Sequence, residues 1–112
     1  MTNTVFEAQI RTRPGMAIID LAGEINAFAE EAMSRAYDEA EKSAPERVVL
    51  NFREVTYINS TGIALIVGLL ARARKSRREL NVVGLSDHYV EIFQITRLAD
   101  FMRIFPDESS LP

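Results

Sequence analysis

The chain has 112 residues, no cysteine and a formal net charge of −3, and 47% of its residues are hydrophobic and 26% charged. A chain of this length buries one hydrophobic core, so we expect one domain over residues 1–112. The composition excludes a disordered chain, and the lack of cysteine excludes a disulfide scaffold, thiolate nucleophiles and cysteine-ligated metals. The acidic balance argues against direct binding of nucleic acid.

The sequence shows no targeting or membrane-spanning segment. The N-terminal stretch "MTNTVFEAQIRTRPG" has no basic segment followed by an apolar run, so no secretory signal is predicted. The longest apolar run, residues 63–71, is under half of the roughly 20 residues that cross a bilayer. We therefore expect a cytoplasmic protein that does not insert into membranes.

The first part of the chain predicts a hairpin followed by a helix. "TVFEAQIRT" (residues 4–12) alternates with period two, and "MAIIDLAG" (residues 16–23) is short, β-branched and bounded by glycines, as is typical of two paired strands. Residues 27–42 have the spacing of an amphipathic helix. Its expected inner face consists of Phe28, Ala32, Ala36, Tyr37 and Ala40.

The rest of the chain alternates strands and helices. "RVVLNF" (47–52) is typical of a central strand covered on both faces. A loop over 53–60 leads to a helix from Ser60 to about residue 78, whose first half is apolar nearly all round. A strand (79–85) and a helix (86–96) follow, the helix capped by Ser86 and with Tyr89, Ile92 and Phe93 facing inward.

Residues 97–107 predict a short helix and a terminal strand, and residues 108–112 are expected to fray, which leaves an ordered core of about residues 4–106. This order of elements predicts a single α/β domain with a mixed sheet of four to five strands and about four helices.

A polar cluster stands at the start of the 60–78 helix. In one interpretation, Asn59 or Ser60 caps the helix by accepting a hydrogen bond from a free N–H group of the first turn. In the other, Ser60 carries the function, because a helix N-terminus favours negative charge and tolerates a phosphate on this hydroxyl. The two interpretations are compatible. Gly62 lowers helix propensity but allows another backbone to approach closely.

The sequence offers Ser60 no catalytic partners. The only histidine, His88, lies on a different predicted helix, and neither G-x-S-x-G nor G-x-x-x-x-G-K-[ST] is present. The scattered acids form no metal-binding pattern. We therefore predict no enzymatic activity, no metal and no cofactor. A run of cations is interpreted as the solvated end of the 60–78 helix: Arg72, Arg74, Lys75, Arg77 and Arg78.

The stretch "VVLNFREVTYINSTGIALIVGLLARARK" resembles the central block of STAS domains of the anti-sigma factor antagonist type. In that family a buried strand and a short loop lead to Asp-Ser-Ser/Thr-Gly-Leu-Gly at a helix start. "IIDLAGEINAFAEEAM" is similar to the family's strand, Gly-Glu-Leu/Ile-Asp turn and first helix. "LNVVGLSDHYVEIFQITRLADFMRIFPDESS" is similar to its final half. The resemblance covers nearly the whole chain and implies the STAS fold.

The resemblance also implies partner switching. In the family, an anti-sigma factor that is also a serine kinase, of the histidine-kinase-like ATPase type, phosphorylates the serine that aligns with Ser60. A PP2C-type phosphatase reverses the reaction. The unphosphorylated antagonist binds the anti-sigma factor and thereby releases the sigma factor, whereas phosphorylation breaks the complex. Thr61 is a competing hydroxyl.

Four residues depart from the family pattern. Asn59 and Asn26 replace aspartates, Ala64 replaces the second glycine, and Arg97 replaces a glycine of the final region. Each asparagine removes a negative charge expected near Ser60. This lowers the repulsion of a phosphate but also removes contacts that a kinase or anti-sigma factor expects.

The expected partner-binding surface comprises Gly23, Glu24, Ile25, Asn26, Asn59, Ser60, Thr61, Gly62 and Ile63. An alternative function is a constitutive STAS scaffold or accessory subunit of a signalling or membrane-transport complex. In that case Ser60 is not phosphorylated and only contributes to the helix cap.

Overall fold

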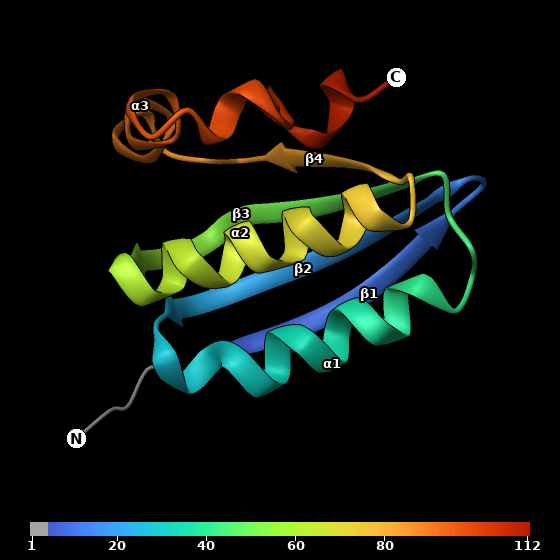
Figure 1. Ribbon diagram of the computed structural model, residues 1–112, viewed down its shortest axis with the longest axis horizontal. Helices are drawn as coiled ribbons and strands as arrows, with labels where there is room; N and C mark the ends of the chain where they lie inside the picture. Colours follow the sequence, from blue (N-terminus) through green and yellow to red (C-terminus); the bar gives the residue numbers. More distant parts are fainter. Residues whose placement is uncertain (1–4) are drawn as a thin grey trace.

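Five strands form one mixed sheet in the order β1-β2-β3-β4-β5 (Figure 1). The computed structural model describes residues 5–112, so Thr4, the predicted start of the first strand, lies outside the described residues. β1 is antiparallel to β2, and all other neighbouring strands are parallel. The strands are β1 (Glu7–Arg13), β2 (Met16–Ile25), β3 (Arg47–Ile58), β4 (Glu79–Val83) and β5 (Arg103–Phe105). The predicted α/β fold with a mixed sheet is confirmed.

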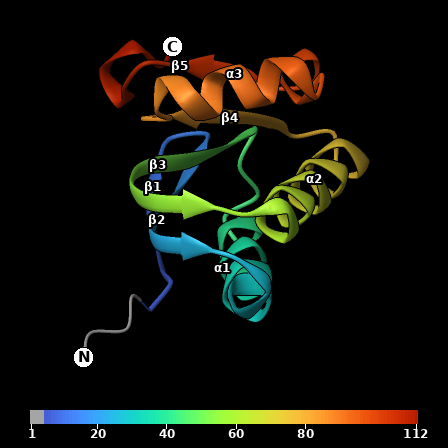
Figure 2. The same cartoon turned by 90° about the vertical axis from the view of Figure 1, so that its left-hand side faces the viewer.

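Three α-helices connect the strands within residues 5–112: α1 (Glu30–Glu41), α2 (Ser60–Lys75) and α3 (Asp87–Ile95). Three 3-10 turns accompany them: η1 (Ala27–Ala29), η2 (Leu98–Asp100) and η3 (Glu108–Ser110). The prediction of about four helices included η2, which is a single 3-10 turn. α1 and α2 lie on the same face of the sheet, and α3 lies by β4 and β5 (Figure 2).

The central strands are buried on both faces. Leu50 and Val82 point into the main core under α1 and α2, whereas Val49 and Val83 belong to a second apolar cluster on the opposite face. Leu111, near the C-terminus, packs against that second cluster. The prediction that residues 47–52 form a central, covered strand is therefore confirmed.

β3 is twice as long as the sequence predicted, and most of the expected loop over 53–60 is strand. The pairing with β4 stops at Asn51, while the pairing with β2 continues to Ile58. The outer half of β3 is thus an edge strand, so its side chains are mostly exposed and polar. A buried-strand pattern does not describe such a segment.

The predicted inner face of the first helix is wrong at Phe28, and the second helix is shorter than predicted. α1 begins at Glu30, so Phe28 lies in the preceding η1 turn, where it is 95% exposed instead of buried. The first half of α2 is apolar nearly all round, as predicted, and packs on the sheet through Ile66, Leu69 and Leu70, while Val67 on its outer face is 46% exposed. α2 also ends at Lys75, since Arg77 adopts a left-handed φ of 58° that stops the helix.

The C-terminal segment expected to fray contains η3. Glu108 accepts hydrogen bonds from Arg11 at 2.8 and 3.0 Å and forms an ion pair with Arg13. These contacts join the end of the chain to β1, the strand at the opposite edge of the sheet.

Candidate functional site

β2 and β3 end side by side, and an asparagine follows each strand. Because the strands are parallel, their carboxyl ends lie at the same edge of the sheet. Asn26 Oδ1 accepts the Phe28 N–H at 2.9 Å and caps η1. Asn59 Oδ1 accepts the Gly62 N–H at 2.8 Å and caps α2, while the Asn59 N–H donates to Ile25 O at 3.2 Å. The two segments predicted to bind a partner therefore lie next to each other.

Ser60 is the first residue of α2, and its side chain is exposed. Of the two residues proposed as the cap, the structure uses Asn59. Within residues 5–112, neither the Ser60 hydroxyl nor the neighbouring Thr61 hydroxyl has a hydrogen-bond partner. Both hydroxyls are therefore accessible without breaking an existing contact.

Gly62 allows α2 to begin directly against the end of β2. A Cβ atom at this position would lie 2.1 Å from Ile25 O and 2.9 Å from Ile58 Cγ2. No side chain fits at such distances, so the expected close approach of a second backbone is confirmed. Gly62 thus fixes the position of Ser60 relative to β2.

The expected partner-binding residues differ in exposure. Ser60 and Thr61 are exposed, Glu24, Asn26, Asn59 and Ile63 are half-buried, and Gly23, Ile25 and Gly62 are buried. The buried residues position the others and have no surface to offer a partner. Gly23, expected in a turn, lies instead within β2, where its φ of 93° accompanies a register shift against β3.

The N-terminus of α2 favours an anion at Ser60. The first turn of α2 contains no acidic residue, and its cap, Asn59, is neutral. The free N–H groups of a helix N-terminus give it a partial positive charge of about half a unit. Asparagine caps as well as aspartate but leaves this charge uncompensated.

Two exposed aromatic residues border the site, and sequence reasoning missed both. Phe28 follows the Asn26 cap and is 95% exposed, and Tyr57 precedes the end of β3 and is 53% exposed. The sequence predicts Phe28 on the inner face of a helix, but that helix starts two residues later. The signal was available, because an asparagine followed by a short turn displaces the helix start.

The end of β3 is also held from the side of α3. Tyr89 Oη accepts the Ile58 N–H at 2.9 Å and lies 3.3 Å from Ile58 O. The neighbouring His88 is exposed, and its ring packs against that of Tyr89 at 4.9 Å. His88 makes no hydrogen bond to Ser60 or to any other residue in the described range. His88 is therefore not paired with Ser60.

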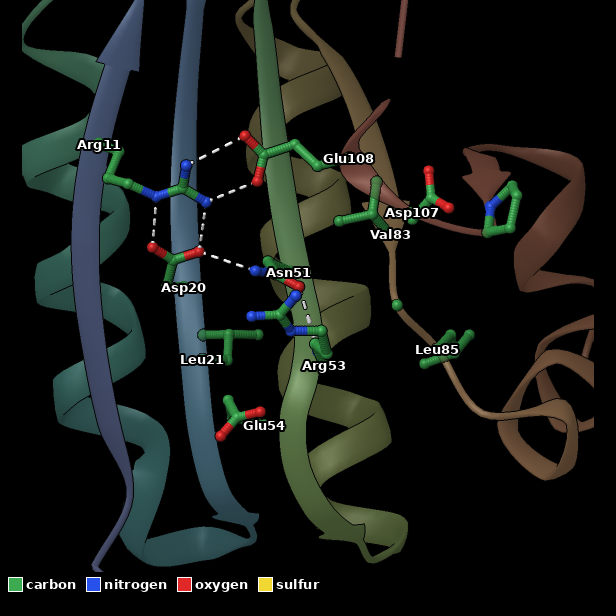
Figure 3. Close-up of a pocket in the computed structure, with 12 residues that line it drawn as sticks. Arg11, Asp20, Leu21, Asn51, Arg53, Glu54, Val83, Leu85, Asp107 and Glu108 are labelled. Atoms are coloured by element: carbon green, nitrogen blue, oxygen red, sulfur yellow. Dashed lines mark hydrogen bonds and ion pairs between the residues drawn. The ribbon is translucent and has the colours of Figure 1, made fainter. Parts of the chain in front are cut away.

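The face of the sheet opposite α1 and α2 has a hollow of about 670 Å³ lined by both polar and apolar side chains (Figure 3). At its centre, Arg11 pairs with Asp20 at 2.6 and 2.8 Å and with Glu108, while Asn51 donates to Asp20 at 2.9 Å. Hydrogen bonds from Arg11 lower the pKa values of both Asp20 and Glu108. These groups satisfy one another's hydrogen-bonding capacity, so the cluster connects β1 and β2 to η3 near the C-terminus.

Residues 5–112 contain no cluster of three potential histidine, cysteine, aspartate or glutamate ligands suited to a metal ion. Over the same range, no helix combines the length and the apolar character required to span a bilayer.

The family model of the STAS domain matches residues 7–111. The chain therefore belongs to the STAS domain family, as the resemblance of its sequence had indicated. Within this family it is similar to anti-sigma factor antagonists. The anti-sigma-B factor antagonist of Listeria monocytogenes is 33% identical over 86 residues, which are 77% of this chain and 75% of that protein.

Solved structures share the fold. An anti-sigma factor antagonist from Mycobacterium paratuberculosis matches with a TM-score of 0.79 at 16% identity, over 94% of this chain and 89% of that one. The Bacillus cell fate determinant SpoIIAA in its phosphorylated form matches with a TM-score of 0.69 at 21% identity, over 95% and 96%. At these identities the likeness concerns the fold alone.

Proposed function

We propose that this protein is an anti-sigma factor antagonist, a non-enzymatic protein that binds an anti-sigma factor and is released when Ser60 is phosphorylated. The observation that carries the proposal is the exposed, unbonded Ser60 hydroxyl at the start of α2, next to a neutral cap. The name of the Listeria relative supports an anti-sigma factor as the partner. Such a partner acts on transcription, so the proposed switch operates in the cytoplasm.

The partner contacts the exposed part of the edge where β2 and β3 end. Glu24, Asn26 and Asn59 supply polar groups around Ser60, and Phe28 supplies an exposed aromatic ring. Aromatic residues that become fully desolvated contribute much of the binding energy at protein interfaces. We therefore extend the surface expected from the sequence by Phe28 and Tyr57.

Phosphorylation acts by charge and hydration. A phosphate adds about 1.5 to 2 negative charges at neutral pH. On the free protein, the N-terminus of α2 stabilises this charge, so the fold is retained. In the complex, the same phosphate must lose water and meet the partner's surface. A typical coupling free energy of about 1 to 3 kcal/mol changes partner affinity roughly 5- to 150-fold.

The proposed enzymes that set the phosphorylation state are the anti-sigma factor itself, as a serine kinase of the histidine-kinase-like ATPase type, and a PP2C-type phosphatase. Asn59 keeps the cap geometry of the family's aspartate without its charge. The cognate kinase is therefore expected to tolerate a neutral residue before the serine. Thr61 is the competing acceptor because it is equally exposed.

The test is phosphate mapping by mass spectrometry after incubation with ATP and the kinase encoded beside this gene. We expect phosphate on Ser60, none on the Ser60→Ala variant, and unchanged incorporation in the matched control Thr61→Val. Loss of incorporation in Thr61→Val alone would move the switch to Thr61. No incorporation in any variant would favour the constitutive scaffold.

A further inference from the structure

An apolar groove of about 510 Å³ lies between α2 and the segment that follows α3. Its walls include two partly exposed hydrophobic side chains, Val67 (46% exposed) and Phe101 (53% exposed). The remaining apolar lining is Leu70, Ala71 and Leu98. Concave apolar sites of this size accommodate a side chain of a partner, and exposed hydrophobic surface at such a place marks an interaction site.

The rim of the groove is positively charged. Arg74 lines it, with its guanidinium 5.1 Å from the centroid of the Phe101 ring. Arg74, Lys75 and Arg77 form no ion pair with any acid of residues 5–112, whereas Arg72 pairs with Asp38. In a chain of net charge −3, this is a local basic surface that a negatively charged occupant would neutralise.

The same chain displays a side chain of matching chemistry. Phe28 is the most exposed large hydrophobic residue of the described range, and the Asn26 cap holds its backbone in place. Glu30, two residues later, begins α1, is exposed and forms no ion pair within residues 5–112. An aromatic ring followed by a free carboxylate complements an apolar groove with a free arginine at its rim.

Phe28 does not reach the groove of its own chain. α1 contacts the flank of α2 that carries Ala64 and Gly68, where Glu30 and Met33 line a separate depression. The groove lies on the other flank of α2, against Leu98 and Phe101 of the C-terminal segment. Contact between the two surfaces therefore requires two molecules.

We propose that the groove binds Phe28 of a second copy of this chain, with Glu30 of that copy pairing with Arg74. The phenyl ring packs between Val67 and Phe101, where an edge-to-face arrangement of the two rings is favourable. The contact joins two different surfaces, so association continues as concentration rises. One aromatic anchor and one exposed ion pair give a weak, reversible contact.

Self-association has a consequence for the proposed switch. Phe28 borders the Ser60 surface, so a copy that holds Phe28 covers part of the surface proposed for the anti-sigma factor. The two contacts then compete. This consequence rests on the proposed function, but the association itself does not, and the Ser60→Ala variant is expected to associate like the wild type.

Sedimentation velocity of the full chain from about 10 µM to about 1 mM tests the inference. We expect the average mass to rise with concentration and the association to weaken several-fold between about 50 and 500 mM salt. Phe28→Ser and Arg74→Glu should each weaken association at least about tenfold. The double variant Glu30→Arg/Arg74→Glu should restore it. Ile95→Ser, at a site 72% exposed outside the groove lining, is the matched control and should associate normally.

Three results would overturn the inference: a monomer over the whole concentration range, equal association of wild type, Phe28→Ser and Arg74→Glu, or no rescue by the charge exchange. Far-ultraviolet circular dichroism of each variant checks that it is folded. If the protein stays monomeric at all concentrations, we expect the groove to bind an acidic partner other than this chain.

Discussion

Two glycines of α2 should respond in opposite ways to alanine, and the contrast tests how the site is built. At Gly62, a Cβ atom would lie 2.1 Å from Ile25 O, and at Gly68 it would meet no atom within 4 Å. Ordinary van der Waals contact begins near 3.4 Å, so Gly62→Ala forces the start of α2 away from β2 by more than about 1 Å. The displacement strains the hydrogen bond from the Gly62 N–H to Asn59 as well.

The expected cost of Gly62→Ala combines overpacking, about 1 to 3 kcal/mol, and the weakened cap, about 1 kcal/mol. This combined cost is a large part of the free energy of unfolding of a typical domain, which is about 5 to 15 kcal/mol. Gly68→Ala should instead stabilise the protein by up to about 1 kcal/mol, because alanine is the better helix former. Urea unfolding of both variants measures the two free energies. A stabilisation by Gly62→Ala equal to that by Gly68→Ala would refute the close approach of α2 to β2.

Three further predictions concern the cap, a strained residue and the C-terminal ion pairs. Asn59→Ala should lower the free energy of unfolding by about 1 kcal/mol, whereas Asn59→Asp should keep the cap and add about 0.3 to 1 kcal/mol at neutral pH; urea unfolding of the pair compares them. Arg97 has a left-handed φ of 66°, which glycine adopts without strain, so Arg97→Gly should stabilise the protein by up to about 1 kcal/mol in thermal unfolding. Arg97→Ala loses the same exposed ion pair to Asp100 but keeps a Cβ atom at this φ, so it should not stabilise the protein. The hydrogen bond from Arg11 lowers the folded-state pKa of Glu108 from 4.5, so the carboxylate stabilises the fold above that value and this contribution is lost as the pH falls through the folded pKa. Glu108→Gln should therefore lose less stability in acid than the wild type does. An identical dependence of the unfolding free energy on pH in the two proteins would contradict the pairing with Arg11.

The order of strands and helices could be predicted because the buried segments carry clear periodicity. The apolar run of residues 47–52 and the alternation in β1 each reflect which faces are covered. The second half of β3 could not be predicted in this way. This half has no pairing with β4 and is mostly exposed, so its residues show no buried-strand pattern. Its length is set by pairing with β2, which is distant in sequence.

The candidate site was predicted in part. The sequence placed Ser60 at a helix start, but only the structure shows that Asn59 is the cap and that the Ser60 hydroxyl is free. Gly23 and Ile25 belong to the site by position, yet they are buried. Exposure depends on how β2, β3 and α2 pack together, which local residue patterns do not contain. Phe28 was misplaced for a related reason, since a helical wheel assumes that the helix has already begun.

Asn26 and Asn59, the two asparagines that depart from the expected family pattern, have the same structural role in this chain. Asn26 and Asn59 occupy equivalent places, each after a parallel strand and each as a helical cap. Both side-chain oxygens accept the hydrogen bond that an aspartate would accept. Each asparagine therefore caps its helical turn without adding a negative charge.

Isothermal titration calorimetry of this protein with the anti-sigma factor encoded beside its gene tests whether phosphorylation of Ser60 controls partner binding. We expect unphosphorylated protein and Ser60→Ala to bind with similar affinity, and protein phosphorylated on Ser60 to bind roughly 5- to 150-fold more weakly. Equal affinity of the phosphorylated and unphosphorylated forms would contradict the claim that Ser60 controls the partner.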